Sequence, residues 1–143
     1  MNGEAQSRLR VLVVDESQAM RRELRRILEP LAEVSVVGMA QNAEAALDLF
    51  FHYRPDVMVV SICLPDRNGF EVLDCVRQAE PNCAVIIMTK QPNPCIEQSG
   101  RLLGAAAVCP KSGGFVELRE VVRWLATEKS GREIEGGRHA MPS

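Results

Sequence analysis

The stretch that decides the fold spans residues 55–69 and reads Pro55-Asp56-Val57-Met58-Val59-Val60-Ser61-Ile62-Cys63-Leu64-Pro65-Asp66-Arg67-Asn68-Gly69. Its unbroken apolar run from Val57 to Val60 is typical of a strand that is buried on both faces, as strands of a parallel sheet are. Open α/β sheets bind their ligands in a crevice at the carboxyl ends of the strands. Ser61, which ends this strand, is therefore predicted to face such a crevice.

Short β-branched runs alternate with helical patterns five times along the chain. Strands are expected near residues 9–14, 34–38, 57–61, 84–89 and 105–109. Helical patterns follow them at about 20–31, 43–53, 70–79, around 102–103 and 115–127. Such alternation predicts an α/β fold, with a parallel sheet covered by helices on both faces. Five units match the flavodoxin-like doubly wound (βα)5 sandwich of strand order 2-1-3-4-5, whose crevice lies at the ends of the first and third strands.

The composition indicates one globular domain. The chain has 143 residues, of which 46% are hydrophobic and 25% charged. The domain is expected to span residues 8–128, and the glycine-rich polar stretch at 129–143 is expected to be a disordered tail. The formal net charge of −2 disfavours nucleic-acid binding, which usually needs a strongly basic domain. Without a signal segment or a long apolar run, the chain is predicted to be cytoplasmic, with no membrane partner.

The cysteines and histidines do not suggest a zinc site or a disulfide framework. Five cysteines are an odd number, and no two of them form a C-x-x-C pair. The two histidines, His52 and His139, are too few and too scattered to complete a zinc site. We expect reduced cysteines that serve as small apolar residues. Cys63 differs only in its place, two residues past Ser61.

The stretch at 55–69 resembles the third strand of response-regulator receiver domains, which belong to bacterial two-component signalling systems. The resemblance covers about residues 8–128. It implies that the acidic pair Asp15 and Glu16, after the first strand, corresponds to the family's magnesium ligands, with the backbone carbonyl of Cys63 as a third. It also implies that Thr89, which ends the fourth strand, and Lys111, which follows the fifth, correspond to the groups that contact the phosphoryl oxygens.

The chain departs from the family pattern at two functional positions. The residue that corresponds to the phosphoryl-accepting aspartate is Ser61, and the aromatic switch residue of the family corresponds to Val108. Lys90 stands where the family usually has a small residue, and Ser112 follows Lys111 where a proline is usual. These departures predict a degenerate pseudo-receiver that has lost its acceptor and its switch.

The predicted metal site is weakened by the same change. Mg²⁺ prefers oxygen ligands and sheds water reluctantly, so losing a carboxylate at position 61 removes one of its few hard ligands. We therefore expect no resident cofactor and at most weak Mg²⁺ binding. From the residues alone, Asp15 or Ser17 could equally cap the helix that follows.

The expected function is that of a single-domain, phosphorylation-independent interaction module and not of an enzyme. A histidine kinase, an output protein or another signalling protein is the expected partner, through the face formed by the fourth helix, fifth strand and fifth helix. A homodimer is left open. One alternative is a response regulator that still functions as a switch, because it is phosphorylated at Asp66 or responds to another ligand. A more distant one is a magnesium-dependent phosphohydrolase, but Ser17 stands where that class needs an acid.

Overall fold

The structure is a computed structural model, and it describes residues 8–135 of the chain. Its strands are β1 (Leu9–Val14), β2 (Val34–Ala40), β3 (Val57–Ser61), β4 (Ala84–Thr89) and β5 (Ala107–Pro110). Its helices are α2 (Gln18–Leu28), α3 (Ala43–Tyr53), α4 (Gly69–Ala79), α5 (Pro94–Leu102) and α6 (Val116–Glu135), with a 3₁₀ turn over Gly113–Phe115. None of the helices described between residues 8 and 135 is long and apolar enough to cross a membrane.

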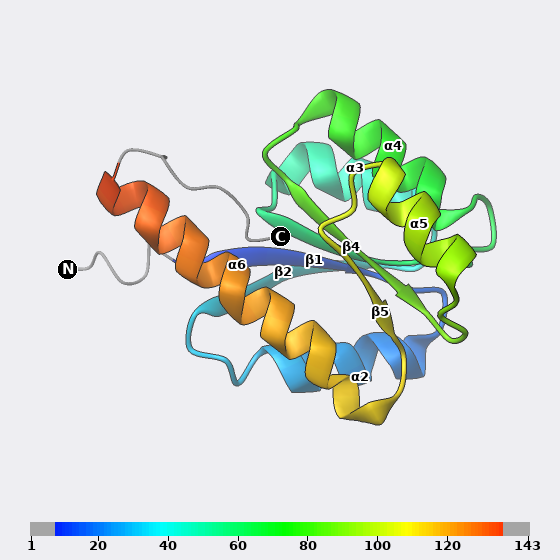
Figure 1. The fold of residues 1–143 in the computed structure, drawn as a ribbon, viewed down its shortest axis with the longest axis horizontal. Coiled ribbons are helices and arrows are strands. Elements are labelled where there is room, and N and C mark those ends of the chain that lie inside the picture. Colours follow the sequence, from blue (N-terminus) through cyan, green and yellow to red (C-terminus); the bar gives the residue numbers. More distant parts are fainter. Residues whose placement is uncertain (1–7, 136–143) are drawn as a thin grey trace.

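The strands form one parallel sheet in the order β2-β1-β3-β4-β5. Helices α2 and α6 cover one face of the sheet, and α3, α4 and α5 cover the other (Figure 1). This arrangement confirms the predicted flavodoxin-like fold. The order reverses between β1 and β3, so the loops after these two strands splay apart and leave a crevice at their carboxyl ends.

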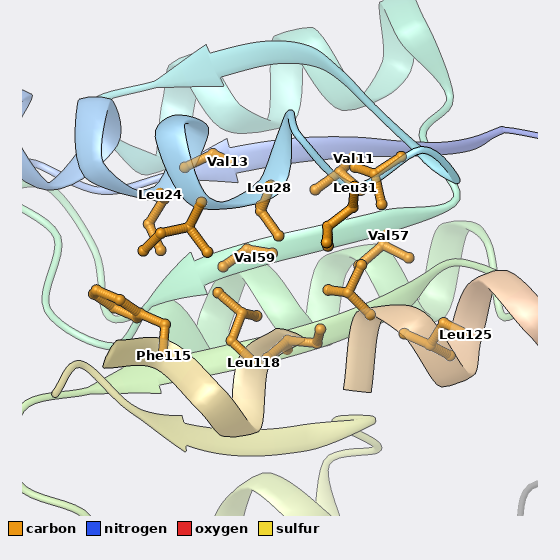
Figure 2. Packing of buried hydrophobic residues seen from close by; sticks show 14 of the residues in the cluster. Val11, Val13, Leu24, Leu28, Leu31, Val57, Val59, Phe115, Leu118 and Leu125 are labelled. Carbon is orange, nitrogen blue, oxygen red and sulfur yellow. The ribbon is translucent and has the colours of Figure 1, made fainter. Parts of the chain in front are cut away.

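Two apolar layers fill the space between the sheet and its helices. Successive side chains of β3 point to opposite faces, so Val57 and Val59 belong to one layer while Met58 and Val60 belong to the other. All four are at most 1% exposed, which explains the unbroken apolar run in the sequence. Figure 2 shows the first layer, to which α2, α6 and the residues that adjoin them contribute Leu24, Leu28, Leu31, Phe115, Leu118 and Leu125.

The last helix is longer than the sequence predicts. Helix α6 continues to Glu135, whereas the pattern of apolar residues places its end near Thr127. Lys129 explains the difference in part, because its Nζ donates to the backbone carbonyl of Arg8 and contacts the Asp56 carboxylate, each at 2.9 Å. Residues 129–135 are thus helical, and the disorder predicted for them is corrected. The rest of that predicted tail, 136–143, lies outside the described residues.

Candidate functional site

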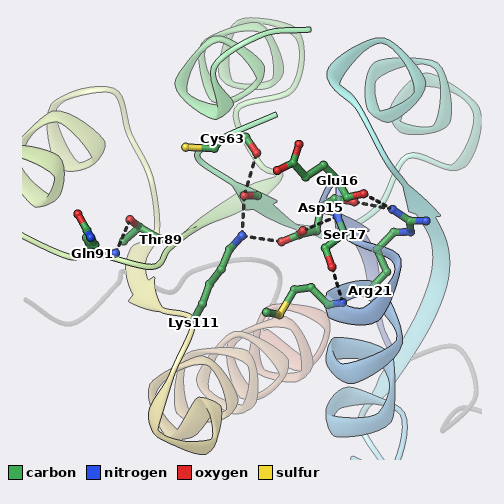
Figure 3. A network of polar contacts seen from close by, with 10 residues as sticks. Asp15, Glu16, Ser17, Arg21, Cys63, Thr89, Gln91 and Lys111 are labelled. Atoms are coloured by element: carbon green, nitrogen blue, oxygen red, sulfur yellow. Dashed lines mark hydrogen bonds and ion pairs between the residues drawn. The ribbon is translucent and has the colours of Figure 1, made fainter. Parts of the chain in front are cut away.

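Four polar residues meet at the carboxyl ends of four neighbouring strands. Asp15 follows β1, Ser61 ends β3, Thr89 ends β4 and Lys111 follows β5. All four line one cavity of about 570 Å³, and three of them, Asp15, Ser61 and Thr89, are at most 3% exposed. The fold therefore brings together the residues that the sequence places at separate strand ends. Figure 3 shows how Asp15, Thr89 and Lys111 of this cluster lie.

Ser61 lies at the centre of the cluster. Its hydroxyl is 1% exposed and donates a hydrogen bond to the carbonyl oxygen of Cys63 at 3.2 Å. The Nζ of Lys111 donates to the Ser61 Oγ at 2.8 Å. The serine thus both donates and accepts, and its hydroxyl has fixed partners on either side.

Lys111 also forms a buried ion pair with Asp15. Its Nζ lies 2.7 Å from Asp15 Oδ2, and the two side chains are only 8% and 2% exposed. Asp15 Oδ1 accepts a hydrogen bond from the backbone N–H of Ser17 at 2.9 Å. Asp15 Oδ2 receives no hydrogen bond of ordinary geometry among the described residues, so its contact with the ammonium is mainly electrostatic. A pair buried this deeply is screened little by salt.

Arg21 contacts the backbone of the acidic loop that follows β1. Its guanidinium donates to the backbone carbonyls of Asp15 at 2.7 Å and Glu16 at 3.2 Å. Ser17 caps α2, since its Oγ accepts from the backbone N–H of Met20. In the sequence Arg21 is one of four arginines close together on this helix (Arg21, Arg22, Arg25 and Arg26), and its spacing alone does not predict a contact with the acidic loop. The Glu16 side chain remains exposed.

The remaining sequence-predicted residues lie around the cavity or near it. Thr89 Oγ1 accepts a hydrogen bond from the backbone N–H of Gln91 at 3.2 Å. Lys90 lines the same cavity and is exposed. Val108, on β5, packs beneath α5, where a Cβ added to Gly100 would lie 2.6 Å from Val108 Cγ2. Helix α5 therefore approaches β5 closely at a position that only glycine allows without a shift.

The family model of the response regulator receiver domain matches residues 11–123. The chain belongs to the response regulator receiver domain family. It is a receiver-domain signalling protein of the two-component type.

The receiver domain is similar to several curated proteins and solved structures. It is 31% identical over 114 residues to a protein-glutamate methylesterase/protein-glutamine glutaminase of Carboxydothermus hydrogenoformans, covering 79% of this chain and 32% of that protein. Protein CcdB of Bacillus subtilis is 36% identical over 96 residues, with 67% of this chain and 79% of that protein covered.

Solved receiver domains show the same likeness. The signal receiver domain of NarL from Mycobacterium tuberculosis has 29% identity and a TM-score of 0.75, over 87% of this chain and 98% of that one. The response regulator domain of Thermotoga maritima CheB has 28% identity and a TM-score of 0.70, over 94% and 99%. The chain spans only 32% and 22% of the length of the first two curated relatives.

Asp66 lies in the loop after β3 of this receiver domain but is engaged elsewhere. Its two carboxylate oxygens accept hydrogen bonds from the backbone N–H groups of Ala43 at 2.8 Å and Glu44 at 3.0 Å, at the start of α3. The hydrogen bond from Ala43 is the main reason that the pKa of Asp66 is lowered. Asp66 does not line the cavity that contains Ser61. Its geometry is that of a helix cap supplied from a distant loop.

Two of the three predicted magnesium ligands have other partners in this structure, and the third is exposed. Asp15 Oδ2 faces the Lys111 ammonium, the Cys63 carbonyl accepts the Ser61 hydroxyl, and the Glu16 side chain is exposed. Within residues 8–135 no group of three or more His, Cys, Asp and Glu side chains is placed to hold a metal ion. A divalent cation at Asp15 would have to displace an ammonium group that already neutralises the carboxylate.

Proposed function

We propose that this receiver domain works as a protein-interaction module without being phosphorylated, because Ser61 takes the place of the acceptor aspartate. The observation that carries the proposal is the surroundings of Ser61: it ends β3 beside Lys111, in the cavity that Thr89 and Asp15 also line. In this proposal Ser61 occupies the acceptor position and supplies a neutral hydroxyl instead of a carboxylate. The domain is proposed to be a binding protein and not an enzyme.

The chemistry of the cluster supports this proposal. A serine hydroxyl is a weak nucleophile unless an adjacent base takes its proton. The basic group in contact with Ser61 is Lys111, which is paired with the Asp15 carboxylate and donates a hydrogen bond to the serine oxygen. A lysine that acts as an ammonium donor cannot serve as the base. His52 is exposed on α3 and does not line the cavity.

The partner-binding face proposed for the module is formed by α5, β5 and α6. Leu102, Leu103 and Val116 lie on these elements or just beyond their ends, and they are 79%, 37% and 46% exposed. A histidine kinase, an output protein or another signalling protein would bind there. Phe115 is not available for such a contact, because its ring is 7% exposed and packs in the core. Any switching would come from a partner that prefers one of two conformations.

Incubation with a small phosphoryl donor tests the proposal. The native protein, Ser61→Asp and Asp66→Ala are each treated with acetyl phosphate and MgCl₂, and their intact masses are measured. The native protein is expected to gain no phosphoryl group, whereas Ser61→Asp is expected to gain one. A native protein that becomes phosphorylated would contradict the proposal. Loss of that label in Asp66→Ala would then support the alternative acceptor.

The chemical stability of any label identifies the residue type. An acyl phosphate on aspartate is cleaved by hydroxylamine, whereas a phosphate ester on serine is not. A label on the native protein that resists hydroxylamine would therefore point to a hydroxyl residue such as Ser61, and a labile label would point to a carboxylate such as Asp66.

A further inference from the structure

The ionisable side chains of the crevice balance one another without a metal. The cavity is lined by two carboxylates, Asp15 and Glu16, and by two ammonium groups, Lys90 and Lys111. Their formal charges therefore sum to zero. An aspartate at position 61 would add one negative charge, which a divalent cation could offset. With a serine at position 61 this extra negative charge is absent, and no divalent cation is needed to offset it.

We infer that Lys111 is the resident cation of this crevice and that, with a serine at position 61, it excludes divalent metal ions from Asp15. The inference deepens the proposed function and shares one premise with it, the serine at the acceptor position. It concerns metal binding, however, and can be tested with no phosphoryl donor present.

The contacts of Lys111 show that it already occupies the place of a cation beside Asp15. Its Nζ lies 2.7 Å from Asp15 Oδ2 and 2.8 Å from Ser61 Oγ, and its side chain is only 8% exposed. If a metal ion took Asp15, the ammonium would keep only a neutral hydroxyl as its partner in a buried place. An unpaired buried charge is strongly unfavourable. The lysine therefore competes with a metal for the same carboxylate oxygen.

The surroundings of the acidic loop also oppose metal binding. Arg21 places a guanidinium on the backbone carbonyls of both Asp15 and Glu16, so another positive charge lies behind the carboxylates. The Cys63 carbonyl, the third predicted ligand, already accepts the Ser61 hydroxyl. Magnesium would have to displace one ammonium, approach one guanidinium and compete with one hydroxyl, while losing part of its own hydration.

Two independent substitutions should open the site. Lys111→Met removes the competing ammonium and leaves the Asp15 carboxylate without its positively charged partner. Ser61→Asp keeps the lysine but offers it a second carboxylate, so Asp15 is freed for a metal ion and the total negative charge rises. Lys90→Met is the matched control, because it removes an ammonium from an exposed side chain that lines the same cavity.

A titration with MgCl₂ at constant ionic strength tests the inference, with the amide NMR signals of Asp15, Glu16 and Cys63 as the readout. The native protein and Lys90→Met are expected to show no saturable shift. Lys111→Met and Ser61→Asp are expected to saturate, with affinity at least about tenfold higher than that of the native protein, or ~1.4 kcal/mol. Circular dichroism checks that each variant is folded, and if Lys111→Met is not, Ser61→Asp decides alone.

Saturable magnesium binding by the native protein would overturn the inference. A folded Ser61→Asp protein whose amide signals show no saturable shift would overturn it as well. Neither outcome would show that the native protein accepts a phosphoryl group. Conversely, a native protein that is phosphorylated but binds no magnesium alone would contradict the proposed function and leave this inference standing. The two claims can therefore fail separately.

Discussion

The Nζ of Lys111 lies 2.8 Å from the Oγ of Ser61, so the lysine that follows β5 donates directly to the serine that ends β3. The same ammonium faces the Asp15 carboxylate after β1. One side chain thus ties the carboxyl ends of three strands together. The polar groups at the base of the crevice are thus paired with one another, and the consequences for stability and chemistry can be measured.

The buried ion pair predicts a large loss of stability when one partner is removed. Asp15→Asn would leave the Lys111 ammonium without a counter-charge at a side chain that is 8% exposed. Breaking a buried pair in this way costs about 3–5 kcal/mol. We expect the free energy of unfolding, measured with urea, to fall by that order.

The matched test of this pair is a double-mutant cycle with Lys111→Met. If the two side chains interact as described, the double variant should be clearly more stable than the sum of the single losses implies. Additive losses would show that the ion pair contributes little.

The Asp66 cap predicts a pH-dependent difference in stability. Because backbone N–H groups at the start of α3 stabilise its carboxylate, the folded-state pKa of Asp66 lies below the ordinary value of about 4. The stabilisation is therefore present above the unfolded-state pKa and is lost as pH falls through the lowered folded-state pKa. Asp66→Ala is expected to unfold at lower urea concentration at pH 7, with the difference shrinking toward pH 3. A difference that is constant with pH would argue against a charged cap.

The close approach of α5 and β5 predicts coupling between Gly100 and Val108. A methyl group at position 100 would meet the stiff, branched Val108 side chain at 2.6 Å. Overpacking of this kind costs about 1–3 kcal/mol, which opposes the gain of about 1 kcal/mol from replacing a helical glycine by alanine. Gly100→Ala should thus be more favourable in a Val108→Ala background than in the native one. Equal effects in both backgrounds, measured by thermal unfolding, would show that the contact is relieved without cost.

Cysteine reactivity provides a direct check on the packing. Cys63, Cys75 and Cys95 are exposed, whereas Cys83 and Cys109 are buried. Burial raises the pKa of Cys83 to about 12 and that of Cys109 to about 11. A thiol reagent that attacks the thiolate should modify the three exposed residues in the native state and reach the other two only after unfolding. Rapid modification of Cys83 would contradict the packing of the sheet against α4.

The fold was predictable because each of its signals is local. The apolar run at 57–60 and the regular alternation of strands and helices determine a parallel sheet with few alternatives. The same reasoning places Asp15, Ser61, Thr89 and Lys111 at strand ends, and the order of the strands then brings them together. Neither step needs knowledge of side-chain contacts.

The contacts within the site were not predictable in the same way. Asp66 caps a helix that starts 23 residues earlier, and Arg21 turns from a basic helical face toward two backbone carbonyls. Both depend on how loops pack in three dimensions. The end of α6 was misjudged for a related reason: the glycine and serine near residue 130 weaken the helical pattern, and the contact of Lys129 with Asp56 is invisible in the sequence.

The most direct test of the central claim is an amide NMR titration of the native protein with beryllofluoride and MgCl₂, beside Ser61→Asp. Beryllofluoride imitates a phosphoryl group on an acceptor carboxylate. We predict no saturable shifts at Thr89 and Lys111 in the native protein and clear shifts at both residues in Ser61→Asp. Saturable shifts at these residues in the native protein would mean that the crevice still binds a phosphoryl-like group, and would contradict the account of a domain that works without phosphorylation.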